Sequence, residues 1–98
     1  MRVRFWGVRG STPTPLKENL GYGGNTSCVE VRTDSDEILV FDGGTGIRLL
    51  GKALEQEFDG ARIRAHIFFS HFHIDHIQGV PFFTPLYSPE NHFTFYFA

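Results

Sequence analysis

Residues 63–76 read IRAHIFFSHFHIDH, and the character of the sequence changes in the middle of this stretch. The first half alternates apolar side chains with other residues, which predicts a β-strand with one buried face: Ile63, Ala65, Ile67 and Phe69. The second half packs four potential metal ligands into six residues: His71, His73, Asp75 and His76. Neutral imidazole and carboxylate both bind divalent transition metals well. The stretch therefore predicts a strand that delivers a metal-binding segment at its end.

Four further segments have the pattern of strands. Residues 2–5 alternate arginine with apolar residues, which predicts a strand with one buried face. Residues 28–32 alternate in the same way, and the wholly apolar residues 38–41 predict a short strand covered on both faces. These three segments are expected to form a small meander. Residues 92–97 alternate phenylalanine with other residues and predict a last strand.

One helix is predicted from about Thr45 to Phe58, because apolar residues recur there at helical spacing and Asp59-Gly60 follows. The preceding glycine-rich turn, residues 43–46, lacks the lysine and the spacing of a phosphate-binding loop. A tight strand-to-helix turn is the better interpretation of those glycines. The chain is therefore expected to be an α/β protein.

Composition limits the functional class. The 98 residues suit one domain, residues 1–98, or a piece of a larger one, and 41% hydrophobic with 20% charged residues is typical of a globular protein. A formal net charge of −2 does not favour a dedicated nucleic-acid or membrane binder, although it permits a nuclease whose metals supply positive charge. The single cysteine, Cys28, and the lack of a secretory signal or an apolar span predict a cytoplasmic protein.

The spacing of the four candidate ligands predicts two donor pairs. His71 and His73 can project to one side, because residues two apart in an extended strand share a face. A turn into a short helix can then bring Asp75 and His76 to a neighbouring position, so that each pair serves one ion. Two metals roughly 3.5–4 Å apart can share a bridging hydroxide, since metal binding lowers the pKa of water to about 7.

Other interpretations of these residues were weighed. His66 and His92 stand alone and are expected to be surface or hydrogen-bonded structural residues. A closed structural zinc site is less favoured than an open one, because such sites prefer cysteine and Cys28 is the only one in the chain. Ser70 is not surrounded by the glycine pattern of a catalytic serine elbow, so it is not expected to be a nucleophile.

The motif HFHIDH matches the His-x-His-x-Asp-His signature of the metallo-β-lactamase-fold hydrolases. Four segments resemble one branch of that superfamily, which is similar to ribonuclease Z and phosphodiesterases: FWGVRGSTPTP (5–15), GGNTSCVEV (23–31), FDGGTGIRLLG (41–51) and SHFHIDHIQGVPFF (70–83). The resemblance implies an αββα sandwich of two mixed sheets with helices outside. This chain would supply the N-terminal portion of it.

Residue roles follow from the same resemblance. His71 and His73 are similar to the ligands of the first metal, and Asp75 and His76 to those of the second. Asp75 would also position water or protonate the leaving group as a catalytic residue. Asp42 is similar to an aspartate that supports the metal loop from behind the ligands, although a simple turn aspartate explains it equally well. The two divalent ions are expected to be zinc, with manganese or iron as alternatives.

The expected function is hydrolysis of phosphodiester bonds, in a small-molecule or nucleotide substrate; the charge does not indicate RNA. The resemblance implies further ligands, a histidine, a bridging aspartate and a last histidine, that cannot be assigned here. The apolar strand 92–97 also needs a cover, so we expect an incomplete site. The alternative is a truncated, non-catalytic metal-binding fragment that needs a second half or a partner chain. A thioester hydrolase or oxidoreductase on the same fold, and a homodimer, are further alternatives.

Overall fold

The computed structural model describes residues 1–8, 25–70 and 74–97, with only the backbone for residues 74 and 75. Its elements are, in order, β1 (Arg2–Gly7), β2 (Cys28–Arg32), β3 (Ile38–Phe41), α1 (Ile47–Phe58), β4 (Arg64–Phe69), α2 (Ile74–Ile77), the 3₁₀ turns η3 (Val80–Phe82) and η4 (Thr84–Tyr87), and β5 (His92–Phe97).

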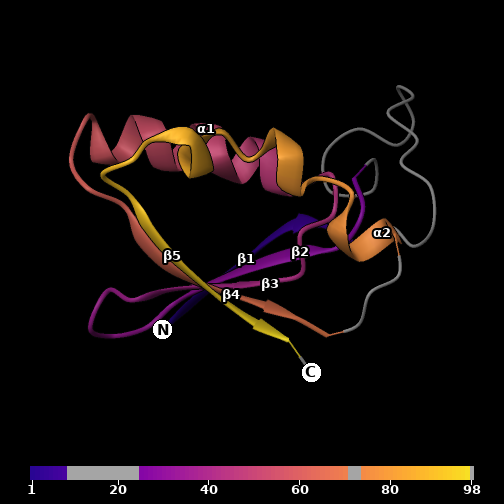
Figure 1. Cartoon of the computed structure of the whole chain (residues 1–98). Helices are drawn as coiled ribbons and strands as arrows, with labels where there is room; N and C mark the ends of the chain where they lie inside the picture. The colour runs from indigo at the N-terminus through magenta and orange to yellow at the C-terminus, as the bar shows by residue number, and fades with distance from the viewer. Residues whose placement is uncertain (9–24, 71–73, 98) are drawn as a thin grey trace.

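The described strands form one mixed sheet in the order β1-β2-β3-β4-β5 (Figure 1). The first three strands pair antiparallel, as the predicted meander requires, whereas β4 is parallel to both β3 and β5. The crossover from β3 to β4 contains α1, which lies along one face of the sheet (Figure 1). The predicted strands, the helix and the α/β class are thus confirmed.

Helix α1 begins at Ile47, two residues later than predicted, because Thr45 is used in the turn before it. The Thr45 backbone N–H donates to Thr26 Oγ1 at 2.8 Å, and the Thr26 N–H donates to Thr45 Oγ1 at 2.9 Å. The helix ends as predicted at Phe58, where Asp59 takes a left-handed conformation with φ of 43°. These contacts fix the start of α1 against the chain that leads into β2.

The hydrophobic core lies between α1 and the sheet. Apolar side chains one helical turn apart on α1 meet the alternating side chains of β4, and Phe83 fills the space beside them. The buried residues on these elements are Ile47, Leu50, Leu54, Ala65, Ile67, Phe69 and Phe83. This packing holds β4, and with it the start of the histidine-rich segment, firmly in the sheet. Within the described ranges, no helix is long and apolar enough to cross a membrane.

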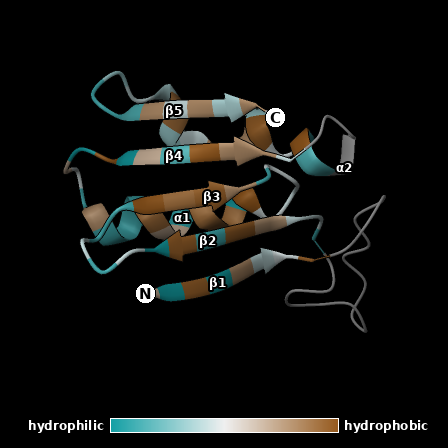
Figure 2. Ribbon diagram, turned by 90° about the horizontal axis from the view of Figure 1, so that it is seen from below, coloured by the Kyte–Doolittle hydropathy of each residue, from teal (hydrophilic) through white to brown (hydrophobic). Residues whose placement is uncertain are grey.

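The opposite face of the sheet is open among the described residues, and Figure 2 shows the strands from this side with α1 behind them. Val3 and Phe5 lie on the open face and are each 49% exposed, so the prediction that they form a buried face of the first strand is wrong. Phe41 is also exposed there, so β3 is not covered on both faces. The physical reason is that α1, η3 and η4 cover only the face that carries Ile38 and Val40.

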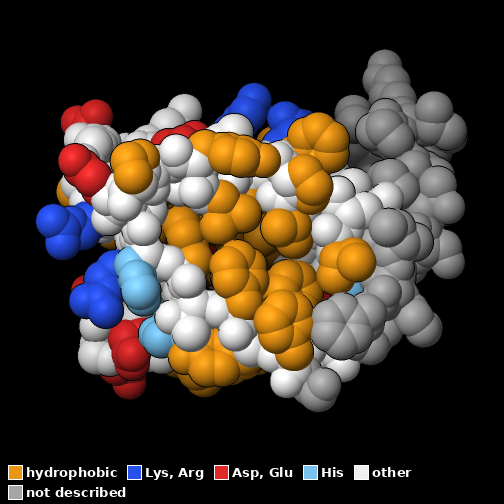
Figure 3. Space-filling view, viewed as in Figure 1, with side chains coloured by type: hydrophobic (Ala, Val, Ile, Leu, Met, Phe, Trp, Pro, Cys, Tyr) orange, Lys and Arg blue, Asp and Glu red, His pale blue; other side chains and the backbone are white. Residues whose placement is uncertain are grey.

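Aromatic rings form a row on the open face. Phe68 stacks on Phe41 at 5.1 Å and on Tyr96 at 4.5 Å between ring centroids. Apolar side chains also gather at the β5 edge of the sheet, which faces the viewer in Figure 3. The second sheet of the expected sandwich is not among the described residues and stays a prediction.

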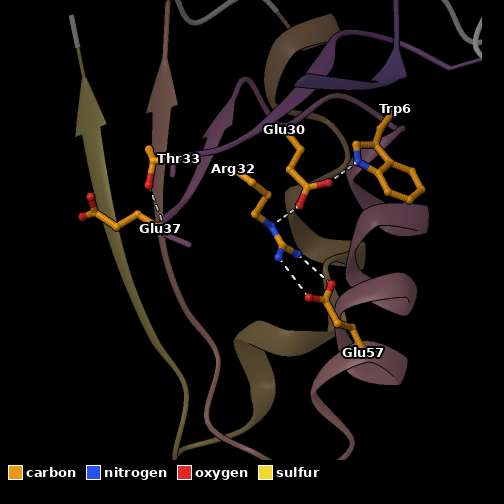
Figure 4. A network of polar contacts seen from close by, with 6 residues as sticks. All are labelled: Trp6, Glu30, Arg32, Thr33, Glu37 and Glu57. Carbon is orange, nitrogen blue, oxygen red and sulfur yellow. Dashed lines mark hydrogen bonds and ion pairs between the residues drawn. The ribbon is translucent and has the colours of Figure 1, made fainter. Parts of the chain in front are cut away.

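A polar network lies between the sheet and α1, where it joins β1, β2 and α1 (Figure 4). Arg32 donates from Nε to Glu30 at 2.6 Å and from Nη1 and Nη2 to both carboxylate oxygens of Glu57 at 2.9 and 2.7 Å. Trp6 Nε1 donates to Glu30 at 3.0 Å, and the Arg4 guanidinium lies 4.3 Å from the Trp6 ring. Glu30 and Arg32 are only 3% and 8% exposed, so these charges are buried as partners rather than alone.

Candidate metal centre

The histidine-rich segment begins where β4 ends. Phe69 is the last residue of β4 and Ser70 follows it, whereas His71 and His73 lie outside the described residues. The next described element is α2, which carries Asp75 and His76, so the short helix that the two-pair arrangement uses is present. The Asp75 side chain lies outside the described set, so the two-pair arrangement of ligands stays a prediction.

Asp42 lies next to this segment, at the end of β3. It is 7% exposed, and its φ of 68° is a left-handed conformation that is rare for a residue other than glycine. Its backbone N–H donates to the Phe68 carbonyl at 2.8 Å. Its carboxylate accepts the Ser70 N–H at 2.9 Å, and the Ser70 Oγ lies 3.0 Å from each carboxylate oxygen. Asp42 therefore holds the residue that immediately precedes His71.

The same carboxylate reaches the other end of the segment. His76 Nδ1 lies 2.9 Å from Asp42 Oδ2, and the His76 side chain is 17% exposed. The backbone reinforces this contact, because the Gly43 N–H donates to the His76 carbonyl at 2.6 Å. With Nδ1 this close to a carboxylate, Nε2 is the ring nitrogen left for a metal ion, as is usual for metal-binding histidines. The supporting role of Asp42 for a metal ligand stays a prediction.

Close packing of two glycine-containing loops brings α2 against the end of β3. The Gly79 N–H donates to the Gly43 carbonyl at 2.8 Å. A Cβ atom on Gly79 would lie 2.0 Å from the Gly44 carbonyl oxygen, so any other residue would push the loops apart. Glycine at position 79 therefore sets the distance between Asp42 and the helix that carries His76.

A hollow of about 280 Å³ adjoins Asp42 and Ser70 at the ends of β3, β4 and β5. Its remaining lining is aromatic: Phe41, Phe68, Phe69, Tyr96 and Phe97. The described lining contains no lysine or arginine, so it offers no fixed positive charge to an anionic substrate.

The two other histidines lie away from the segment. His66 Nδ1 lies 2.9 Å from the Tyr96 hydroxyl on the open sheet face, and His92 is exposed at the start of β5. Both agree with the predicted structural or surface role. Among the residues that the structure describes, no group of three or more histidine, cysteine, aspartate or glutamate side chains could hold a metal ion.

Ser70 was missed as a site residue by the sequence analysis, which considered it only as a nucleophile. The missing signal is strand register: Phe41 pairs with Phe68 in the parallel β3–β4 ladder. Because parallel strands end at the same edge of a sheet, the residues that follow Phe41 and Phe68 come close together there. The pairing cannot be read from local periodicity.

Comparison with known proteins agrees with this fold. The family model described as the metallo-beta-lactamase superfamily matches residues 21–91, which is more than half of the chain. The chain therefore belongs to the metallo-beta-lactamase superfamily, whose members are generally hydrolases that commonly bind divalent metals, usually zinc. The predicted superfamily is confirmed, whereas the ribonuclease Z-like branch stays a prediction. Neither the curated proteins nor the solved structures gave a match.

Proposed function

We propose that the chain contributes to a metal-dependent hydrolase of phosphodiester bonds, in a small-molecule or nucleotide substrate. The observation that carries this proposal is the contact between His76 Nδ1 and Asp42 Oδ2 at 2.9 Å, in a chain of a largely hydrolytic superfamily. A histidine fixed by a carboxylate in this way is suited to hold zinc through Nε2. The resemblance of the flanking segments to phosphodiesterases supports the choice of substrate.

The proposal assigns the chain's own residues to binding and to proton transfer. His71 and His73 hold one divalent ion, and Asp75 and His76 hold the other. Asp42 keeps the ring of His76 in one orientation from behind. Asp75 would accept the proton that the attacking water loses and pass it to the leaving oxygen, which a carboxylate within hydrogen-bond reach of both can do. When bound, divalent ions supply ionised water at neutral pH and stabilise the charge that develops on the phosphoryl oxygens.

The lack of cationic side chains in the described lining of the hollow beside Asp42 supports metal dependence. A phosphodiester carries a negative charge, and the described lining has no cationic side chain to meet it. Electrostatic stabilisation of developing charge is usually the largest catalytic contribution, so in this site it falls to the ions. The aromatic walls would accept the organic group of the ester rather than its phosphoryl group.

The test is turnover of bis(p-nitrophenyl) phosphate by the chain, first freed of metal by chelation and then supplied with zinc, manganese or iron. Turnover that needs the metal and is lost in His73→Ala and Asp75→Ala supports the proposal. His92→Ala serves as the matched control, because that histidine is exposed at the start of β5, and it should keep full activity. Turnover of a thioester but not of the phosphodiester would contradict the choice of substrate.

The second candidate is a non-catalytic metal-binding chain that acts with a partner. The open apolar face, with Val3, Phe5 and Phe41 exposed, favours it. Sedimentation of the zinc-loaded chain separates the two candidates. A stable, stoichiometrically metallated monomer with turnover supports the hydrolase, whereas a zinc-binding chain without turnover supports the partner-dependent alternative.

A further inference from the structure

We infer that Ser70 is a positioning residue for the candidate metal centre: its hydroxyl and backbone N–H hold the Asp42 carboxylate in the orientation that fixes the ring of His76. The inference rests on the proposed function, because the benefit of this positioning is tighter metal binding. The ordering of the His76 ring through Asp42 can be measured without any metal.

Ser70 and His76 both contact the carboxylate of Asp42. Ser70 Oγ lies 3.0 Å from both Oδ1 and Oδ2 of Asp42, and the Ser70 N–H donates to Oδ1 at 2.9 Å. Oδ2 lies 2.9 Å from His76 Nδ1. Hydrogen bonds to a charged acceptor are stronger than neutral ones. Ser70 therefore restricts rotation of the carboxylate and keeps Oδ2 directed at the imidazole.

The backbone alone would hold this carboxylate less well. Asp42 lies in a left-handed conformation with φ of 68°, which L-residues disfavour. Its own N–H is bound to Phe68 on β4, which anchors the main chain of Asp42 but not its carboxylate. The Ser70 hydroxyl adds two contacts to the one hydrogen bond that the Ser70 N–H makes to that carboxylate.

The chemical consequence concerns which ring nitrogen of His76 carries the proton. A carboxylate that accepts from Nδ1 favours the neutral tautomer with the proton on Nδ1, which leaves the Nε2 lone pair for a cation. Without the Ser70 hydroxyl, only the Ser70 N–H still holds the carboxylate, and this preference weakens. Loss of a supporting contact of this kind typically lowers metal affinity about 10- to 100-fold.

The experiment compares Ser70→Ala with wild type and with Ser70→Thr, which keeps a hydroxyl. Ser70 is exposed, so truncation leaves no buried void. The isosteric pair Ser70→Thr and Ser70→Val gives the same comparison at constant side-chain volume if the alanine variant does not fold. Ser88→Ala, at an exposed serine after η4, is the matched control.

Two quantities are measured for each variant. Long-range ¹H–¹⁵N correlation NMR of the metal-free protein at pH 8 reports the His76 tautomer. Competition with a chromogenic chelator reports the affinity for Zn²⁺. We expect the Nδ1–H form to dominate in wild type and in Ser70→Thr, and to fall in Ser70→Ala together with a 10- to 100-fold loss of affinity.

The outcomes separate the inference from the proposed function. An unchanged tautomer in Ser70→Ala and Ser70→Val overturns the inference, whatever the metal affinity. A changed tautomer in a protein whose wild type binds no zinc supports the positioning by Ser70 and overturns the proposed function. A changed tautomer with weakened zinc binding supports both.

Discussion

Asp42 and His76 are 2.9 Å apart at Oδ2 and Nδ1, although Asp42 follows β3 and His76 lies in α2. This contact, with the Asp42–Ser70 hydrogen bonds, ties both ends of the histidine-rich segment to one buried carboxylate. A segment anchored at both ends loses less conformational freedom when it binds an ion, which is the advantage of a preorganised site.

Replacing Asp42 with asparagine should weaken zinc binding about 10- to 100-fold while leaving the fold intact. Asparagine tolerates the left-handed backbone as well as aspartate does, so the change removes charge rather than adding strain. Competition titration with Zn²⁺ measures the effect. Asp36→Asn is the matched control, since Asp36 is exposed and has a similar φ of 63°. Equal losses in both variants would contradict a specific role for Asp42.

The sequence predicted the elements correctly because helices and strands have local periodicities. It predicted which residues share a face of a strand, but not which face the helix covers. On β2 the buried face carries Cys28, Glu30 and Arg32 rather than Val29 and Val31. Charged residues are buried there because α1 brings Glu57 to Arg32, a contact 25 residues apart that no local pattern contains. The Asp42–Ser70 pairing escaped prediction for the same reason.

Replacing Arg32 should destabilise the protein more than replacing Glu57, its more exposed partner. Arg32→Met leaves the Glu30 carboxylate buried without its cation, which costs about 3–5 kcal/mol in buried ion pairs. Urea denaturation of the variant measures the change in unfolding free energy. The double variant Glu30→Gln with Arg32→Met should recover much of the loss, because no buried charge then remains. A double variant as unstable as the single one would contradict this explanation.

Glu57 should make the free energy of unfolding depend on pH in the acid range. The Arg32 guanidinium lowers the pKa of Glu57, mainly through their hydrogen bonds. A carboxylate with a lowered pKa in the folded state contributes stability above its unfolded pKa, and this is lost as pH falls through the folded pKa. Because the Glu57 side chain is half exposed, the contribution should stay below about 1 kcal/mol.

Glu57→Gln should therefore flatten the acid limb of the stability profile and leave the variant less stable than wild type near neutral pH. Denaturation series at several pH values measure both effects. Glu90→Gln, at an exposed position, is the control. A Glu57→Gln profile that runs parallel to wild type through the acid range would show that the ion pair does not contribute.

Alanine at position 79 should destabilise the site and the fold together. The added Cβ would meet the Gly44 carbonyl at 2.0 Å, so the loops must separate, and overpacking of this kind costs about 1–3 kcal/mol. Gly60→Ala is the contrasting variant, because nothing lies within 4 Å of its added Cβ and only its φ of 89° is unfavourable. Both variants should be less stable in urea, but only Gly79→Ala should also bind zinc more weakly. Normal zinc affinity in Gly79→Ala would contradict the link between this loop contact and the site.

Zinc should stabilise the folded chain, and its removal should reverse the effect. A ligand that binds only the native state raises the unfolding free energy by about 2.7 kcal/mol at one hundred times its dissociation constant. Thermal melts with excess Zn²⁺ and with chelator measure this shift. His76→Ala should remove most of it, because His76 is the described histidine that Asp42 holds. His66→Ala changes a histidine bound to Tyr96 on the open face, so that variant should keep the full shift. Equal zinc shifts in the His76 and His66 variants would place the metal outside the segment that the Asp42 carboxylate anchors.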